Sequence, residues 1–440
     1  MTTSLSPEPL KSHLARDGGP KAFPAATGII QPKVGVEEFL SIAERFGFHP
    51  EAMKRLAAAV SDQDLPEGGP HLGRYYGYPK PIKGEQFEAL AREKFAVRHA
   101  LGVSSGTAAL HCAMVGAGVG PGKEVLCAAT GFIATGMAAV LAGGTPVFCD
   151  VDESLMMDPT GLEAHITPDT VAIAPTHYQG AVCDMAPILA LAEKHGLKVI
   201  EDCAQAPGAT YRGRPVGSMG DFGCYSISCY KIIGGGEGGM VVTNDEHAFD
   251  RVRQVAEAGG LWRSNRFAPE RYPGELFAGA NYRLSELEAA VNVVQLGKLE
   301  AVVARYRGVS RRIREKVGVF AGITRTKSND PDGDIGYVLR FFPENDDLGR
   351  QIAEALRAEG IGAGYRGAKA APDWHLSRDM FPLFAKFEDR CLAGLCPVAD
   401  DLFDRSVSIN LSQWWSPADC EAVSDGINKV LSAFCARIDP

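Results

Sequence analysis

Residues 222–239, FGCYSISCYKIIGGGEGG, contain the most informative feature of the chain. The segment begins as an apolar run that is typical of a buried strand, and Lys231 follows that run. Five of the six residues at 234–239 are glycine, a composition that neither a helix nor a regular strand favours. We therefore predict that Lys231 lies on a tight loop at a strand end. The alternative is a surface lysine beside a flexible loop.

An acidic pair follows another strand-like run upstream. Residues 197–200 (LKVI) are followed directly by Glu201 and Asp202. A lysine amine can form a Schiff base with an aldehyde, and a carboxylate can pair with a protonated pyridine nitrogen. Lys231 and Asp202 together therefore predict a binding site for pyridoxal 5'-phosphate. The alternative for Asp202 is a helix cap or a surface acid.

Residues 104–110 (SSGTAAL) join a short predicted strand to a predicted helix. The N-terminus of a helix offers free backbone N–H groups and partial positive charge, which favour a phosphate. The turn is therefore a candidate phosphate site, although Ser105 or Thr107 could simply cap the helix. The glycine-rich residues 116–122 follow a helix and lack the last glycine of a dinucleotide motif, so we expect a helix C-terminal loop there.

Predicted strands and helices alternate along the middle of the chain. Strands are expected at residues 100–103, 124–127, 146–150, 171–175 and 197–200, and helices at 107–115, 132–142 and 185–195. This alternation predicts an α/β fold with a mostly parallel sheet that helices cover. Ligands bind at the carboxyl ends of such strands, where His177 and Asp202 are expected to lie. Asp184 is expected to cap the helix at 185–195.

Changes in pattern along the chain predict four segments. Residues 1–30 are expected to form a flexible leader, and residues 31–83 a helical and loop segment. Residues 84–300 are expected to form a large cofactor-binding domain, and residues 301–440 a smaller C-terminal α/β domain. A long helical pattern at residues 283–317 spans the boundary between these two domains.

Composition narrows the class of protein. Hydrophobic residues make up 45% and charged residues 22% of the 440 residues, as in ordinary globular proteins. The formal net charge of −9 argues against a nucleic-acid-binding surface. The cysteines form no CxxC pair and no zinc-like cluster, so we expect buried thiols and no metal. No secretory signal or membrane-length apolar run is visible, so we expect a cytoplasmic protein without a membrane partner.

Several motifs together resemble the DegT/DnrJ/EryC1/StrS aminotransferases. The resemblance rests on residues 105–110 (SGTAAL), 201–206 (EDCAQA), Ser226 to Lys231, 236–239 (GEGG) and 281–290 (NYRLSELEAA). These motifs follow the family's order, from about residue 84 to the C-terminus. The resemblance implies pyridoxal phosphate fold type I, as in aspartate aminotransferase. It has a large domain with a mostly parallel sheet and a smaller C-terminal α/β domain.

The resemblance also implies a role for each matching residue. Lys231 would form the internal aldimine and move the catalytic proton, and Asp202 would hold the pyridinium. Gln205 would bind the phenolate oxygen of the cofactor, and Phe132 would stack on its ring, although the residues before Phe132 depart from the family pattern. The phosphate ligands would be Ser105, Gly106, Thr107, Ser226 and, from the partner subunit, Asn281. His177, in a His-x-x-Gly match, would either shape the site or pack in the core.

The implied function is a transaminase that forms a homodimer with shared active sites. It would move an amino group from L-glutamate or L-glutamine, through pyridoxamine phosphate, to a keto sugar or keto cyclitol. Such a reaction suits the biosynthesis of amino sugars, antibiotics or surface glycans. One alternative is a sugar dehydratase of the same family, in which histidine replaces the lysine. The other is a non-catalytic relative that senses or assembles. The presence of Lys231 and Asp202 argues against both alternatives.

Loop residues are further candidates for substrate contact. Arg263 and Arg266 could bind a substrate carboxylate or phosphate, with solvated loop charges as the alternative. The tyrosines at 75–76 and the pair Trp374–His375 could also contact substrate, with packed loop anchors as the alternative.

Overall fold

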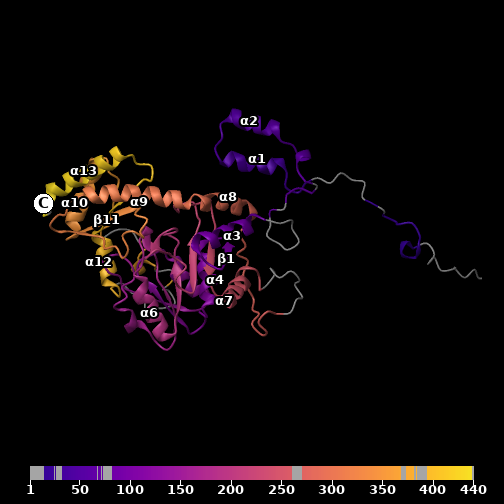
Figure 1. Ribbon diagram of the computed structural model, residues 1–440, viewed down its shortest axis with the longest axis horizontal. Helices are drawn as coiled ribbons and strands as arrows, with labels where there is room; N and C mark the ends of the chain where they lie inside the picture. Colours follow the sequence, from indigo (N-terminus) through magenta and orange to yellow (C-terminus); the bar gives the residue numbers. More distant parts are fainter. Residues whose placement is uncertain are drawn as a thin grey trace, which may run out of the picture. The chain divides into compact units, whose positions relative to one another are not determined.

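The computed structural model describes residues 14–23, 25, 32–66, 68–70, 72, 82–259, 270–367, 373–380, 383 and 394–438 (Figure 1). The chain separates into two compact units, residues 1–72 and 73–440. The first unit contains helices α1 (Val36–Arg45) and α2 (Pro50–Ala59), which lie within the predicted helical and loop segment at residues 31–83. Most of the expected leader, the tyrosines at 75–76, Arg263 and Arg266 lie outside the described residues.

The second unit contains a seven-stranded sheet with the order β1-β9-β8-β5-β4-β2-β3. Its strands are β1 (His99–Val103), β2 (Glu124–Ala128), β3 (Thr145–Cys149), β4 (Thr170–Ala174), β5 (Lys198–Asp202), β8 (Phe222–Ser226) and β9 (Gly239–Thr243). The strands from β8 to β3 pair in parallel, whereas β9 is antiparallel to both β1 and β8. The predicted mostly parallel sheet is confirmed, and β9 is an element that the sequence pattern did not reveal.

Helices connect the strands of this sheet and cover it. They are α3 (Lys83–Phe95), α4 (Gly106–Gly116), α5 (Ala134–Leu141), α6 (Met185–His195) and α7 (Glu246–Ala256). A small ribbon, β6 (Thr210–Tyr211) and β7 (Arg214–Pro215), follows β5. Asp184 does not cap α6, because its carboxylate accepts the Tyr211 hydroxyl at 2.5 Å instead. Within the described parts of the chain, no helix is both long enough and apolar enough to cross a bilayer.

The core of this region is continuous and contains thiols, as the sequence predicts. Every residue of β2, β8 and β9 is buried, and α4 packs against both β8 and β9. Cys127 and Cys224 lie within these buried strands. Burial raises the pKa of Cys224 well above its usual value, so this thiol stays protonated and packs as a small apolar group.

The C-terminal part begins with α8 (Glu286–Gly297) and α9 (Leu299–Lys316). The long helical stretch predicted at residues 283–317 is therefore two helices, which are separated at Lys298. An antiparallel sheet follows, with the order β10-β11-β13-β12. Its elements are β10 (Ile323–Arg325), β11 (Val338–Pro343), α10 (Asp346–Ala358), β12 (Ala363–Tyr365), α12 (Pro397–Arg405), β13 (Val407–Asn410) and α13 (Pro417–Phe434). Helix α13 packs along α9 (Figure 1). A second hydrophobic cluster begins at Val309, whereas Val302, Val303 and Phe342 belong to the first cluster, so the domain boundary near residue 300 stays a prediction.

Candidate active site

Lys231 lies in the loop between β8 and β9, where the sequence places it. The loop closes on itself, because the N–H of Cys229 donates to the carbonyl oxygen of Gly236 at 2.9 Å. Glycine is required at position 234, where an added Cβ would lie 2.3 Å from the carbonyl oxygen of Ser228. The glycine run therefore allows the tight backbone approach that fixes the loop carrying Lys231.

The Lys231 side chain is half-buried and lines a cavity of about 410 Å³. Burial lowers the pKa of its amine below that of a free lysine, and the negative charge of Asp202 acts in the opposite direction. A lowered pKa increases the fraction of neutral amine, which is the form that attacks an aldehyde. Lys231 is therefore not a fully solvated surface lysine.

Asp202 ends β5, and its carboxylate is buried and held from two sides. The Thr135 hydroxyl donates to Oδ2 at 2.6 Å, and the N–H of Ala204 donates to Oδ1 at 3.0 Å. These bonds fix the orientation of a negative charge that acts on the Lys231 amine. Thr135 was not identified from the sequence, although a hydroxyl within the apolar helix at 132–142 was an available signal.

The predicted phosphate turn lies at the first turn of α4, against the end of β8. An added Cβ at Gly106 would lie 2.7 Å from the Cβ of Ser226, so the two backbones approach closely. Ser105 caps the helix, because its Oγ accepts the N–H of Ala108 at 3.0 Å. The N–H groups of Gly106 and Thr107 have no acceptor within the helix itself. Together with the partial positive charge of the helix, they are suited to bind a phosphate.

Gly106→Ala tests this phosphate site. The added methyl group would overlap the Ser226 side chain, so we expect the apparent Kd for pyridoxal phosphate to rise by roughly 10- to 100-fold. Absorbance titration of the apoprotein with the cofactor measures this change. Gly120→Ala is the matched control, since no atom lies within 4 Å of its added Cβ. Its Kd should stay within about twofold of the original value. Equal Kd values for the two variants would contradict the assignment.

The remaining cofactor candidates are not all brought together within one chain. Gln205 lines the same cavity as Lys231. Phe132 precedes α5, is 41% exposed, and lies with its ring centroid 5.3 Å from that of His375, which also lines the cavity. Asn281 is exposed in the segment between α7 and α8. Phe132 and Asn281 are not among the described residues that line this cavity. Asp202, Ser105, Gly106, Thr107 and Ser226 are not among them either, so the roles of all these residues stay proposals.

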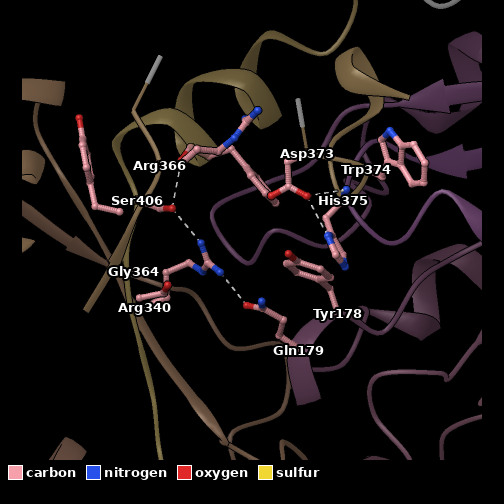
Figure 2. A pocket seen from close by; sticks show the side chains of 12 residues that line it. Tyr178, Gln179, Arg340, Gly364, Arg366, Asp373, Trp374, His375 and Ser406 are labelled. Atoms are coloured by element: carbon pink, nitrogen blue, oxygen red, sulfur yellow. Dashed lines mark hydrogen bonds and ion pairs between the residues drawn. The ribbon is translucent and has the colours of Figure 1, made fainter. Parts of the chain in front are cut away.

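A second cavity, of about 670 Å³, adjoins the Lys231 cavity through Gln179 and His375, which line both (Figure 2). It is also lined by Trp374, so both members of the Trp374–His375 pair lie beside the site. Gln179 adopts a left-handed backbone conformation, with φ of +49°, in the short 3-10 turn η5 (Tyr178–Gly180) that follows β4. Such strained residues cluster at functional sites. Gln179 was not predicted to be a site residue, although it lies within the His-x-x-Gly match.

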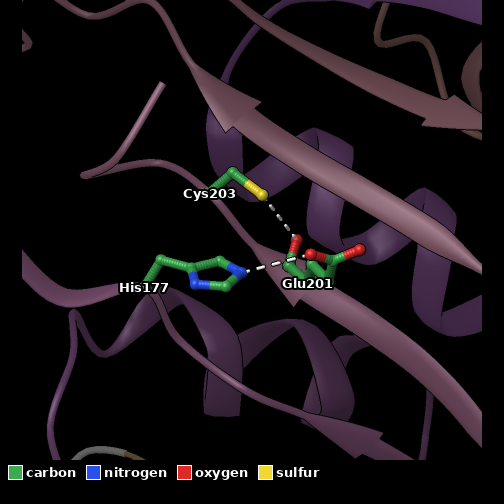
Figure 3. A group of neighbouring side chains, drawn as sticks. All are labelled: His177, Glu201 and Cys203. Atoms are coloured by element: carbon green, nitrogen blue, oxygen red, sulfur yellow. Dashed lines mark hydrogen bonds and ion pairs between the residues drawn. The ribbon is translucent and has the colours of Figure 1, made fainter. Parts of the chain in front are cut away.

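His177, Glu201 and Cys203 form a buried cluster next to Asp202, and their potential ligand atoms lie within 4.8 Å of one another (Figure 3). The two oxygens of Glu201 accept four donors, namely His177 Nε2 and the N–H groups of Gly217, Met219 and Gly220. Because these bonds already occupy the carboxylate, we interpret the cluster as a structural tie and not as a metal site.

The protonation of His177 follows from its partners. Burial lowers the pKa of the ring, whereas Cys183 and Glu201 raise it. The N–H of Cys183 donates to Nδ1 at 3.1 Å, so a proton on Nδ1 would face another donor. We therefore assign a neutral ring with its proton on Nε2, which donates to Glu201. The backbone N–H of His177 also donates to the carbonyl oxygen of Asp202 at 3.0 Å, so this residue both packs and supports the site.

Comparisons with known protein sequences agree with the family that the sequence motifs predict. The model of the DegT/DnrJ/EryC1/StrS aminotransferase family matches residues 82–428. The chain is 36% identical, over 332 residues, to UDP-N-acetyl-3-dehydro-alpha-D-glucosamine 3-aminotransferase of Acidithiobacillus ferrooxidans. This match covers 74% of this chain and 83% of the relative. It is 42% identical, over 226 residues, to GDP-perosamine synthase of Caulobacter vibrioides. That match covers 51% of this chain and 59% of the relative, less than two thirds of its length.

Solved structures show the same fold. DesV of S. venezuelae superimposes with a TM-score of 0.69 at 29% identity, covering 83% of this chain and 92% of that chain. A DegT/DnrJ/EryC1/StrS aminotransferase from Brucella abortus has a TM-score of 0.66 at 28% identity, covering 82% and 92% of the two chains. The fold, the family and the cofactor predicted from the sequence are therefore confirmed. The chain belongs to the DegT/DnrJ/EryC1/StrS aminotransferase family, a family of pyridoxal-phosphate-dependent enzymes.

Proposed function

We propose that this aminotransferase moves an amino group from L-glutamate or L-glutamine to a keto sugar or keto cyclitol. The observation that carries the proposal is the pair formed by Lys231, whose amine is half-buried in a cavity, and Asp202, whose buried charge acts on that amine. The names of the two sequence relatives, both of which refer to amino-sugar synthesis, support a keto sugar as acceptor. A cytoplasmic location and a role in amino-sugar or antibiotic biosynthesis stay predictions.

The described residues fit the cofactor, and each has a definite task. Bound pyridoxal phosphate supplies an aldehyde and an electron-accepting ring. The neutral amine of Lys231 would hold that aldehyde and, once released, act as the base at the substrate carbon. Asp202, oriented by Thr135, would keep the ring nitrogen protonated. Gln205 would donate a hydrogen bond to the phenolate oxygen of the cofactor. The phosphate would be held by Ser105, Gly106, Thr107 and Ser226.

A panel of amino donors tests the proposed half-reaction. With no acceptor present, L-glutamate or L-glutamine should remove the visible absorption of the Lys231-bound cofactor. We expect at least one of them to remove the absorption at least about tenfold faster than L-alanine does, because the larger donors gain additional polar contacts. Stopped-flow absorbance measures the rates. If no amino acid changes the spectrum, the chain is a non-catalytic relative. A deoxygenated product formed without amine transfer would instead indicate the dehydratase.

We also propose that the enzyme is a homodimer in which Asn281 serves the active site of the partner subunit. Asn281 is exposed, so its side chain is accessible to a second chain. Two apolar residues of the following helix α8, Leu287 and Val294, are 44% and 57% exposed. Exposed apolar residues on one element support a protein contact there.

Mixing two inactive variants tests the shared site. Lys231→Ala and Asn281→Ala should each lose most activity alone. If Asn281 acts across the interface, subunit exchange creates hybrid dimers with one intact site, and activity should return to about a quarter of the original value. Each variant exchanged only with itself is the control and should stay inactive. If the mixture also stays inactive although hybrids form, Asn281 does not act on the partner's site.

A further inference from the structure

Arg340 is a buried cation in the wall of the second cavity. It lies on β11 and is only 8% exposed. Its Nη2 donates to Oε1 of Gln179 at 2.6 Å, and its Nη1 donates to Oγ of Ser406 at 2.8 Å (Figure 2). Both acceptors are neutral. Among the residues that the structure describes, no carboxylate forms an ion pair with Arg340, so its charge is not compensated at close range.

The other charged groups around this cavity are paired. Arg366 contacts Asp379, and its Nη1 lies 3.7 Å from Asp404. Asp373 accepts from Nδ1 of His375 at 2.8 Å, and this hydrogen bond lowers the pKa of Asp373. Asp373 forms no ion pair with Arg340, and its charge raises the pKa of the guanidinium only from a longer distance. A buried charge without a close partner is costly, so such an arrangement points to a ligand that supplies the opposite charge.

The position of Arg340 connects it to the cofactor site. Gln179, which accepts from Arg340, donates its backbone N–H to Oε1 of Gln205 at 3.2 Å. Gln205 and Lys231 line the cavity that Gln179 and His375 join to the second cavity. Gln179 thus contacts the guanidinium through its side chain and Gln205 through its backbone N–H.

A neutral donor accompanies the cation. Burial raises the pKa of Tyr178 to about 12, so its hydroxyl stays protonated. Tyr178 lines the same cavity as Arg340. Guanidinium and hydroxyl donors together suit an anionic oxygen.

We propose that the Arg340 cavity is a carboxylate subsite, which binds the carboxylate of a substrate whose reacting carbon lies in the Lys231 cavity. The guanidinium fork matches a carboxylate, and a cavity of about 670 Å³ has room for the rest of a small substrate. The carboxylate belongs either to the amino donor or to an acidic sugar acceptor. This inference rests on the proposed function, because it assigns a substrate to that site.

Equilibrium binding to the holoenzyme tests the subsite without turnover. The probes are glutarate, a dicarboxylate that cannot donate an amine, and glucuronate, an acidic sugar, with glucose as the uncharged comparison. Calorimetry should show that Arg340→Gln weakens the binding of glutarate, glucuronate or both by on the order of 10- to 100-fold. Arg340→Lys, which keeps the charge but loses the fork, should weaken binding less. Arg350→Gln, on the exposed side of α10, is the matched control and should change nothing.

The outcomes are distinct. Loss of glutarate binding alone supports the amino donor as the source of the carboxylate, and loss of glucuronate binding alone supports the acceptor. The proposal is overturned if neither probe binds the unmodified enzyme, or if Arg340→Gln binds both as tightly as Arg350→Gln does. Should Arg340→Gln fail to fold, Arg340→Lys decides the question in the same assay. Failure of the proposed function is seen separately, as the absence of any spectral change when L-glutamate or L-glutamine is added to the unmodified enzyme.

Discussion

Lys231→Ala should abolish the visible absorption of the bound cofactor and lower kcat by at least about 10³-fold. The substitution removes both the amine that holds the aldehyde and the base that moves the substrate proton. Among the described residues that line the cavity, Lys231 is the only lysine, so no other lysine there can replace it. Absorbance spectroscopy of the purified holoenzyme and a steady-state transamination assay measure the two losses.

Two comparisons separate this effect from general damage. Lys194→Ala removes an exposed lysine on α6 that pairs with Glu163, and it should leave the spectrum and kcat unchanged. A small amine such as methylamine, added to Lys231→Ala, should restore part of the rate by taking over the role of the base. Full absorption and full turnover in Lys231→Ala would contradict the assignment.

Asp202→Asn should lower kcat/KM by on the order of 10²- to 10³-fold, because a buried charge that stabilises the protonated ring nitrogen is lost while the volume is kept. The same change has a defined pH effect. Asp202 raises the pKa of the Lys231 amine against the lowering effect of burial. Without it, the amine loses its proton at lower pH. The rate at which the apoprotein takes up the cofactor should therefore rise at a lower pH than in the unmodified protein.

Thr135→Val is the matched comparison for Asp202→Asn. It removes the hydroxyl that donates to Oδ2 of Asp202 but keeps the charge. We expect a smaller loss, about tenfold in kcat/KM, and little change in the pH at which the cofactor is taken up. An unchanged kcat/KM in Asp202→Asn, or a shift of its uptake profile to higher pH, would contradict the role of Asp202.

Local sequence patterns predicted the features that depend on neighbouring residues. The strand before Lys231, the glycine loop after it and the strand that ends at Asp202 are each specified by a short run of the chain. The cap of α4 by Ser105 has the same local origin. These elements meet at one site because the carboxyl ends of parallel strands share one edge of the sheet.

Features that depend on distant partners could not be predicted in this way. The Asp184 carboxylate accepts a hydrogen bond from Tyr211, which is 27 residues away in the sequence. Asp202 accepts one from Thr135, which is 67 residues away. The break at Lys298 interrupts a helical pattern that continues on both sides. Arg340 appears in the sequence as an arginine within an apolar strand, and only the fold shows that it is buried and forms no ion pair with any carboxylate of the described residues.

We expect the cofactor to be bound covalently at Lys231. Borohydride reduces the lysine–aldehyde linkage to a stable bond, and peptide mapping by mass spectrometry then locates the modified lysine. The structure predicts that the reduced cofactor is found on the peptide that contains Lys231. A cofactor attached to any other lysine, or no attached cofactor after reduction of the holoenzyme, would contradict this expectation.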